Sequence, residues 1–362
     1  MMEFQFQDQQ FQLSRYPRHH HPSLRAWSAA DEHILQYCQE QQLGGPALVC
    51  HDRFGFLRTT LSAIEADSML MYASQKKAIL QNLGANQLPL SEERLLLPLD
   101  ELGTYQFGLL KVPKSLELFR FYLHRISEGL HEEGEVVAGF MTRHFSPQML
   151  EIASHYFTDV RQSRAYKKSR LLHLKGKKDL PEHEFLTAFR VDNEGEMRSY
   201  PGVFASNKLD RATRLLLENL RLRASDQKVL DLGCGYGVIA KYIADQKPGC
   251  ELHLMDDNYL ALASAKENLE GQSTHFHFTD SLKEIEEEFD CIVSNPPFHF
   301  EHENNIEIPL QLFREAKSSL KPGGHFQLVA NQHLNYRTHL RKLFPYVAIV
   351  AENQKFVVYD CA

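Results

Sequence analysis

The sequence has few features of secreted, membrane-spanning or metal-clustered proteins. It holds six cysteines in 362 residues, and no two of them are spaced as C-x-x-C. This spacing argues against a zinc site or a disulfide framework, and we expect no metal. The chain has no run of roughly 18 or more apolar residues and no signal-peptide pattern, so we expect no membrane span and a cytoplasmic protein.

The chain also lacks an excess of positive charge. Its net charge is −7, with 24% charged and 43% hydrophobic residues. Such a protein does not bind polyanions through its overall charge, so any contact with nucleic acid must come from a local basic surface. At roughly 100–200 residues per domain, the length predicts two domains.

One stretch of the second half, residues 229–238 (VLDLGCGYGV), joins an apolar strand to a glycine turn and a helical pattern. This order lets a backbone approach a nucleotide-like ligand closely. Val238 stands where the dinucleotide fingerprint has its last glycine. The motif D-x-G-x-G-x-G is instead typical of S-adenosylmethionine (SAM) methyltransferases, which we favour over a tight turn in another α/β domain. Its residues are Asp231, Gly233, Gly235 and Gly237.

Apolar strands alternate with helical segments from this turn onward, which predicts an α/β fold with a doubly wound sheet. Ligands bind at the carboxyl ends of the strands in such a sheet. Asp256 follows one strand and lies close to 20 residues after Gly237, where an acid accepts from a ribose hydroxyl. The sequence separates it poorly from Asp257. Asp280 follows the next strand and either accepts from an adenine amino group or starts a helix.

The most specific motif is Asn295-Pro296-Pro297-Phe298, directly after the apolar strand CIVS. The prolines hold the backbone extended and remove N–H donors, which leaves the Asn295 amide oxygen and the Pro296 carbonyl as acceptors. Two acceptors suit an exocyclic amine on a flat ring, because they relieve charge as its nitrogen attacks. Phe298 offers a face for stacking the base. We predict that these residues are catalytic, rather than a loop with a core phenylalanine.

The first half reads as a faded copy of the second. Segments at 47–57, 71–83, 109–120 and 133–139 echo segments at 228–238, 261–269, 293–314 and 323–331, in the same order. The pattern predicts an internal duplication, and hence two tandem Rossmann-like domains, residues 1–188 and 189–362. Only Gly55 remains of the three glycines. We therefore expect a degenerate first domain that binds no cofactor and serves RNA binding or stability.

A strongly basic stretch lies between the halves, and we interpret it as a basic linker. It carries eight Lys or Arg in 18 residues and no acid. We expect its side chains to contact RNA phosphates, which position an RNA without reading its bases. A solvated strand pair is the alternative. The residues are Arg161, Arg164, Lys167, Lys168, Arg170, Lys175, Lys177 and Lys178.

The motifs LDLGCGYGVI and SNPPFH resemble those of the bacterial ribosomal RNA guanine-N2 methyltransferases. These proteins have two tandem methyltransferase-like domains, a degenerate one followed by a catalytic one. The resemblance covers nearly the whole chain. Flanking segments such as GPALVCHDRFGFL and VANQHLNYRTHLRKLF look more like the large-subunit (23S) members than the small-subunit (16S) members. The resemblance implies methyl transfer from SAM to N2 of one guanine in 23S rRNA, and we expect a monomer.

The resemblance also implies roles for single residues. Asp231 and the three glycines would contact SAM, with Asp256 on its ribose and Asp280 near its adenine. In the segment GVFASNKLDRAT, Phe204 and Asp210 would help form the cofactor pocket, although Ala212 stands where a glycine is expected. Asn295, Pro296, Pro297 and Phe298 would receive the guanine. In the first domain, Asp52 replaces the glycine corner and Lys111-Val112-Pro113 stands in place of the NPPF motif.

Other functions remain open at this point. The same chemistry serves a guanine in 16S rRNA or a glutamine side-chain amide. An NAD-dependent dehydrogenase is disfavoured by the missing fingerprint glycine and by the NPPF corner. A non-catalytic RNA-binding protein of ribosome assembly is disfavoured because Asn295 and the glycine turn are intact.

Overall fold

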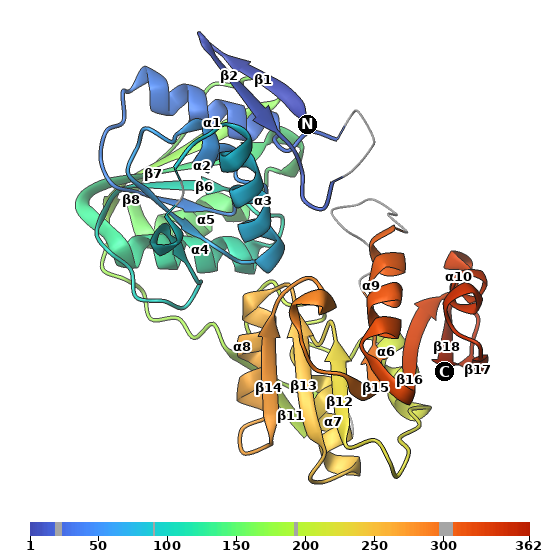
Figure 1. The fold of residues 1–362 in the computed structure, drawn as a ribbon. Helices are drawn as coiled ribbons and strands as arrows, with labels where there is room; N and C mark the ends of the chain where they lie inside the picture. The colour runs from blue at the N-terminus through green and yellow to red at the C-terminus, as the bar shows by residue number, and fades with distance from the viewer. Residues whose placement is uncertain (19–23, 90, 192–194, 297–306) are drawn as a thin grey trace. The chain divides into compact units, whose positions relative to one another are not determined.

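The computed structural model describes residues 1–18, 24–89, 91–191, 195–296 and 307–362. The chain forms two compact units, Met1–Glu184 and Phe185–Ala362, which divide a few residues before the predicted boundary. Each unit is built on a mixed seven-stranded sheet with helices against it (Figure 1). Within the described residues, no helix has the length and apolar character to cross a membrane.

The first unit opens with a hairpin and continues into its main sheet, of order β5-β4-β3-β6-β7-β9-β8. Its strands are β1 (Met2–Phe6), β2 (Gln9–Leu13), β3 (Ala47–Cys50), β4 (Ala66–Met69), β5 (Leu95–Leu96), β6 (Tyr105–Lys111), β7 (Leu130–Met141), β8 (Phe157–Gln162) and β9 (Ser169–Lys177). Its helices are α1 (Ala29–Glu40), α2 (Phe56–Thr60), α3 (Ala73–Ala85), α4 (Leu116–Gly129) and α5 (Pro147–Tyr156), with 3₁₀ turns η1 (Glu92–Arg94) and η2 (Thr142–His144).

The second unit also opens with a hairpin, and its main sheet has the order β14-β13-β12-β15-β16-β18-β17. Its strands are β10 (Thr187–Val191), β11 (Gly195–Ser199), β12 (Lys228–Leu232), β13 (Glu251–Asp256), β14 (Thr274–Phe278), β15 (Phe289–Ser294), β16 (Leu320–Asn331), β17 (Val347–Glu352) and β18 (Phe356–Cys361). Its helices are α6 (Arg211–Glu218), α7 (Val238–Gln246), α8 (Tyr259–Asn268), α9 (Glu307–Ser318) and α10 (Tyr336–Leu343), with 3₁₀ turns η3 (Leu282–Glu284) and η4 (Gln332–Leu334).

The two main sheets share one topology. In each, five strands pair in parallel and the last two add an antiparallel hairpin at one edge. The central strands β3 and β12 are buried on both faces, which explains why most of their residues are apolar, with Asp231 as a buried exception. The structure therefore confirms the predicted fold class, an α/β chain of two tandem Rossmann-like domains.

The basic stretch has a different position from the one predicted. Residues 161–178 do not link the two units, because they complete the β8–β9 hairpin of the first sheet. Strand β9 pairs with the buried strand β7 on its other side. The interpretation as a linker was wrong, because alternation of basic and apolar residues along a half-buried strand resembles a solvated connector when only composition is read.

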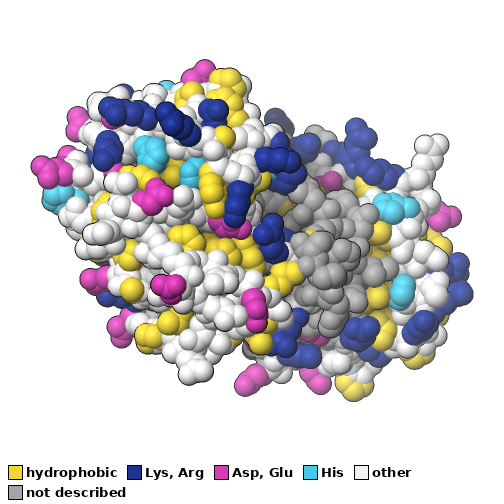
Figure 2. Space-filling view, turned by 90° about the horizontal axis from the view of Figure 1, so that it is seen from above, with side chains coloured by type: hydrophobic (Ala, Val, Ile, Leu, Met, Phe, Trp, Pro, Cys, Tyr) yellow, Lys and Arg dark blue, Asp and Glu magenta, His cyan; other side chains and the backbone are white. Residues whose placement is uncertain are grey.

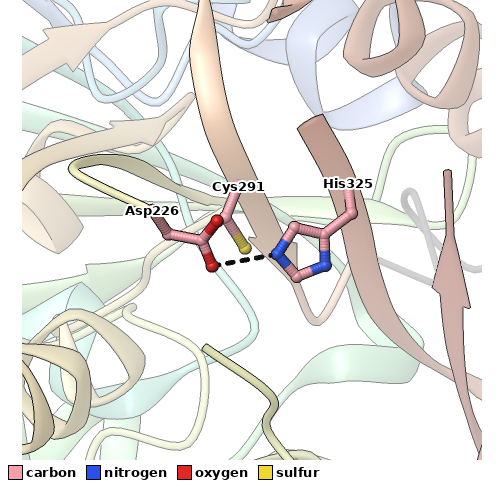
Figure 3. A group of neighbouring side chains, drawn as sticks. All are labelled: Asp226, Cys291 and His325. Carbon is pink, nitrogen blue, oxygen red and sulfur yellow. Dashed lines mark hydrogen bonds and ion pairs between the residues drawn. The ribbon is translucent and has the colours of Figure 1, made fainter. Parts of the chain in front are cut away.

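Three elements of the second unit are tied together at the amino end of the sheet by the buried His325 (Figure 3). Its Nε2 lies 3.1 Å from Oδ2 of Asp226, and its Nδ1 lies 3.0 Å from Oδ1 of Asp360. The thiol of Cys291 completes the group. The two carboxylates and the Cys291 thiol raise the pKa of His325 to about 11, despite its burial. The imidazole is therefore charged at neutral pH and links β16 to β18 and to the loop before β12.

Replacing His325 will destabilise the second unit. Since His325→Asn leaves two carboxylates without a cation, we expect the free energy of unfolding to fall by about 3–5 kcal/mol. The pKa of His325 is higher in the folded state than the ~6.5 of a free histidine, so its contribution is complete below that pH and declines as pH rises toward 11. Urea unfolding between pH 6.5 and 9.5 should show this decline in the wild type and a flatter profile in the variant. His333→Asn, at an exposed histidine, is the control, and equal losses in both variants would contradict the assignment.

Candidate cofactor and substrate site

The glycine turn lies at the carboxyl end of β12, between Leu232 and the first residue of α7. All three glycines have positive φ angles, of 75°, 54° and 83°. A Cβ atom added to Gly233 or Gly235 would meet nothing within 4 Å, whereas one added to Gly237 would lie 2.9 Å from Cβ of Ala265. The first two glycines thus leave an open face for a ligand, and the third lets α7 pack closely against α8.

Asp231 is buried beneath this turn. Its Oδ2 accepts a hydrogen bond of 3.1 Å from the amide of Ala240, and its Oδ1 has no partner among the described residues. Burial raises the pKa of this carboxyl to about 8, and the charge of Asp256 adds to the rise. A buried carboxylate oxygen without a donor is costly, so this position is suited to a positively charged ligand group.

Asp256, the last residue of β13, fixes the shape of the turn. Its Oδ2 accepts from the amide of Gly235 at 2.9 Å, and its Oδ1 accepts from the amide of Asn258 at 2.8 Å. Burial raises its pKa to about 6. These bonds favour Asp256 over Asp257 as the acid that shapes the site. Asp280 lies half-buried, two residues after the next strand, β14.

The segment before α6 is fastened to the turn by residues that the sequence did not single out. The hydroxyl of Tyr236 donates to the carbonyl of Lys208 at 3.2 Å, and the Asn258 side chain donates to the carbonyl of Gly202 at 3.1 Å. Phe204, in this segment, is 68% exposed. Asn258 could have been found as an N-cap residue after a strand. Tyr236 had no such signal.

Asn295 lies at the carboxyl end of β15, directly after Ser294. Its Nδ2 donates to Oγ1 of Thr213 at 2.8 Å and lies 3.4 Å from Oδ2 of Asp210. An ionised carboxylate only accepts hydrogen bonds, so the amide nitrogen faces Asp210 and the amide oxygen points away. That Oδ1 atom is buried and has no partner among the described residues. The side chain is therefore held as an unused acceptor.

The structure describes only some of the other residues predicted at this corner. Asp210 caps α6 by accepting from the amides of Ala212 at 2.8 Å and Thr213 at 3.2 Å. The same carboxylate oxygen faces Asn295, so the helix start and the corner share one anchor. Pro296 is buried, while Pro297 and Phe298 lie outside the described residues. The predicted proximity of Asp210 to the site is consistent with this geometry.

The corresponding corner of the first unit is filled by charged side chains. Strand pairing aligns Leu110 with Cys50 in the first sheet and Ser294 with Leu232 in the second, so Lys111 takes the place of Asn295. Its ammonium group contacts Oδ2 of Asp31 at 2.8 Å. In the loop after β3, His51 and Arg53 stand at the positions of Gly233 and Gly235. We had expected Asp52 at this corner, and it lies between them.

Buried side chains occupy that loop. Arg53 donates to Oγ of Ser74 at 2.8 Å and lies over the ring of Tyr72, 4.7 Å from its centroid. Asp52 accepts from the amide of Arg58 at 2.9 Å. Gly55 keeps a positive φ of 72° at the start of α2, as Gly237 does at α7. The first unit thus retains the helix packing of the motif without its open face.

The eight basic residues of the β8–β9 region lie on an outer edge of the first sheet, and acids neutralise half of them. Figure 2 shows Lys and Arg side chains interspersed with Asp and Glu across the visible face. The side chains of Arg170 and Lys178 donate hydrogen bonds to the side-chain oxygen of Gln162 and the backbone carbonyl of Ser154. The ion pairs are Arg161–Asp159 (2.7 Å), Lys167–Glu32 (2.7 Å), Lys175–Glu135 (2.5 Å) and Lys177–Glu132 (3.7 Å).

Comparison with known proteins divides the chain in the same way. Residues 1–178 match the RLMG N-terminal domain, and residues 194–360 match the methyltransferase small domain. Proteins named ribosomal RNA large subunit methyltransferase G from Shewanella putrefaciens and Shewanella loihica are each 32% identical to the chain. The first alignment covers 96% of both chains, and the second covers 98% of this chain and 93% of the relative.

A solved structure supports the fold over almost the whole length. The T. thermophilus 16S rRNA N2 methyltransferase (RsmC), in complex with AdoMet and guanosine, superposes with a TM-score of 0.77 at 22% identity. The match covers 99% of this chain and 97% of that one. At this identity the likeness concerns the fold, and both units take part in it.

Gly237→Ala is expected to destabilise the protein more than the same substitution at Gly249. The added methyl group would strain the backbone at positive φ and would also collide with Ala265. Gly249→Ala is the control, because Gly249 has a φ of 85° but open space around it. We expect the first variant to lose about 1–3 kcal/mol more than the second in urea unfolding. Equal losses of unfolding free energy in the two variants would show that α7 and α8 can move apart without a free-energy cost.

Proposed function

Because the chain belongs to the family of ribosomal RNA large subunit methyltransferase G, we propose that it transfers a methyl group from SAM to N2 of one guanine in 23S rRNA. The observation that carries the chemistry is the Asn295 amide, whose nitrogen donates to Thr213 and whose buried oxygen has no partner among the described residues. The amino group of guanine is a donor of matching type. We infer a cytoplasmic enzyme, since its substrate is ribosomal RNA.

The residues of the second unit fit SAM. We propose that the open face over Gly233 and Gly235, with Gly237 closing the turn, receives the nucleoside. Asp256 offers acceptors for ribose hydroxyls, and the partnerless oxygen of Asp231 offers one for a cationic group. Asp280, Phe204 and Asp210 complete the proposed pocket. When bound, SAM supplies an electrophilic methyl group on a sulfonium.

The protein's own task is to hold the amine in line with that methyl group. We propose that Oδ1 of Asn295 and the carbonyl of Pro296 accept the two N–H bonds of the guanine amine. These contacts strengthen as the nitrogen gains positive charge, so they stabilise the transition state more than the ground state. Pro297 and Phe298 belong to this proposal through the sequence motif, with Phe298 stacking on the base. A large share of the rate then comes from positioning.

The two alternatives to this function are a 16S rRNA substrate and a non-catalytic role in ribosome assembly. The superposition on a 16S enzyme concerns the fold, while the relatives that are 32% identical carry the large-subunit name, which favours 23S rRNA. A non-catalytic role in ribosome assembly would leave no reason to keep Asn295 oriented by Asp210 and Thr213. We therefore favour methylation of 23S rRNA over both alternatives.

Labelled methyl transfer to purified 23S and 16S rRNA tests the proposal. We expect label in 23S rRNA as N2-methylguanine, with turnover by Asn295→Ala at least about a hundredfold lower because a stabilising acceptor is lost. SAM affinity, measured by calorimetry, should change little in this variant. Label confined to 16S rRNA would overturn the substrate assignment, and SAM binding with no transfer to either RNA would overturn the reaction.

Thr213 is expected to act as a positioning residue through Asn295. Thr213→Val removes the hydroxyl that accepts from the Asn295 amide. We expect kcat to fall by about tenfold, which corresponds to the free energy of one hydrogen bond, and KM for RNA to stay the same. Thr213→Ser keeps the hydroxyl and should retain most of the activity. If Ser and Val variants lose activity equally, the effect is one of packing at the start of α6.

SAM binding is expected to release protons at pH 7. The raised pKa of Asp231, about 8, means that the carboxyl is mostly protonated in the free enzyme. A cationic ligand favours the ionised form and lowers that pKa, so up to about one proton leaves on binding. Calorimetry in phosphate and Tris should give different binding enthalpies for the wild type and equal ones for Asp231→Asn. Equal enthalpies in the wild type would refute the pairing.

A further inference from the structure

The second unit carries a basic surface that the functional motifs do not include. Residues 332–356 contain four Lys or Arg and two His, with Glu352 as the one acid. We name as the α10 surface the set His333, Arg337, Arg341, Lys342 and Lys355. In Figure 2, Lys, Arg and His side chains recur along the right of the view, the side on which Figure 1 has α10, with few Asp or Glu side chains among them.

Strand register places part of this surface at the edge that holds Asn295. Strand β16 runs parallel to β15 with Leu328 opposite Ser294, and it ends at Asn331, where η4 begins. Strand β18 returns with Phe356 opposite Asn331. The amide of Gln332 donates to the carbonyl of Lys355 at 2.9 Å. Thus η4 and the turn between β17 and β18 lie at the carboxyl edge of the same sheet.

The α10 surface differs from the β8–β9 region in its ion pairing. Among the described residues, none of its Lys or Arg side chains forms an ion pair with a carboxylate. Arg341, Lys342 and Lys355 are exposed, while Nε of the half-buried Arg337 has no hydrogen-bond partner there. Arg337 and Arg341 are four residues apart in α10 and so project from one side of the helix. By contrast, four of the eight basic residues between Arg161 and Lys178 form ion pairs.

A nucleic-acid phosphate is the ligand that this arrangement suits. Unpaired Lys and Arg on one face attract phosphates without any base preference, and the affinity comes from released counterions. An enzyme that acts on one base must hold the backbone close to the reacting atom. Strand register places His333 of η4 and Lys355 of the β17–β18 turn at the sheet edge that holds Asn295, which meets that requirement.

We infer that the α10 surface binds the RNA backbone flanking the target guanine. This inference rests on the proposed function for its substrate, and it assigns the main phosphate contacts to the catalytic unit in place of the β8–β9 hairpin. Arg341, Lys342 and Lys355 contact phosphates directly. Arg337, at the buried margin, donates from its guanidinium to a backbone oxygen nearest the site.

Two triple variants with equal charge change test the inference. The first is Arg341→Gln, Lys342→Gln and Lys355→Gln, and the matched control is Arg161→Gln, Lys167→Gln and Lys175→Gln on the first unit. RNA binding is measured by fluorescence anisotropy at 50–200 mM salt, together with kcat, KM for RNA and SAM affinity. Thermal unfolding checks that both variants are folded.

We expect the first variant to bind RNA about tenfold or more weakly, with a salt dependence reduced by roughly two phosphate contacts. Its kcat at saturating RNA and its SAM affinity should match the wild type, and the control should lose less than about threefold. Loss in the control alone, or equal loss in both, would overturn the inference. A wild type that binds 23S rRNA without methylating it would overturn the proposed reaction, while the binding comparison would still decide the surface.

Discussion

The parallel pairing of β12 with β13 and β15 is the constraint on which the site depends. This register brings Asp231, Asp256 and Asn295 to one edge of the sheet, although 25 and 39 residues separate them along the chain. At that edge, one buried oxygen of Asp231 and one of Asn295 have no partner within the part of the chain that the structure describes. Burying an unused acceptor costs free energy, and the proposed function assigns ligand groups to both atoms.

The first unit shows what the same topology becomes without these acceptors. Lys111 takes the place of Asn295 and is neutralised by Asp31, and Arg53 fills the loop that is open at Gly235. Both side chains find partners within the first unit, Lys111 in an ion pair with Asp31 and Arg53 in a hydrogen bond to Ser74. The first unit therefore keeps the sheet topology and the helix-start glycine, Gly55, with charged side chains at the positions of Gly235 and Asn295.

The positive charge that each surface presents depends more on ion pairing than on its number of Lys and Arg residues. The β8–β9 hairpin has the denser run of Lys and Arg, yet nearby acids from α1, β7 and β8 neutralise half of it. The α10 surface has fewer cations, and none of its Lys or Arg side chains forms an ion pair with a described acid. A short-range ion pair removes most of the field that a distant phosphate would feel, so the second surface is the stronger candidate for RNA.

The sequence by itself determined the duplication, the α/β class and the motifs at the strand ends, because glycine spacing, apolar runs and prolines are local signals. It could not determine which side chains meet across strands. Thr213 orients Asn295, and His325 joins Asp226, Cys291 and Asp360, only because the sheet order brings these residues together. The sequence also misplaced the basic stretch as a linker, since ion pairing and strand pairing depend on residues far away in the chain. Tertiary structure decided those contacts.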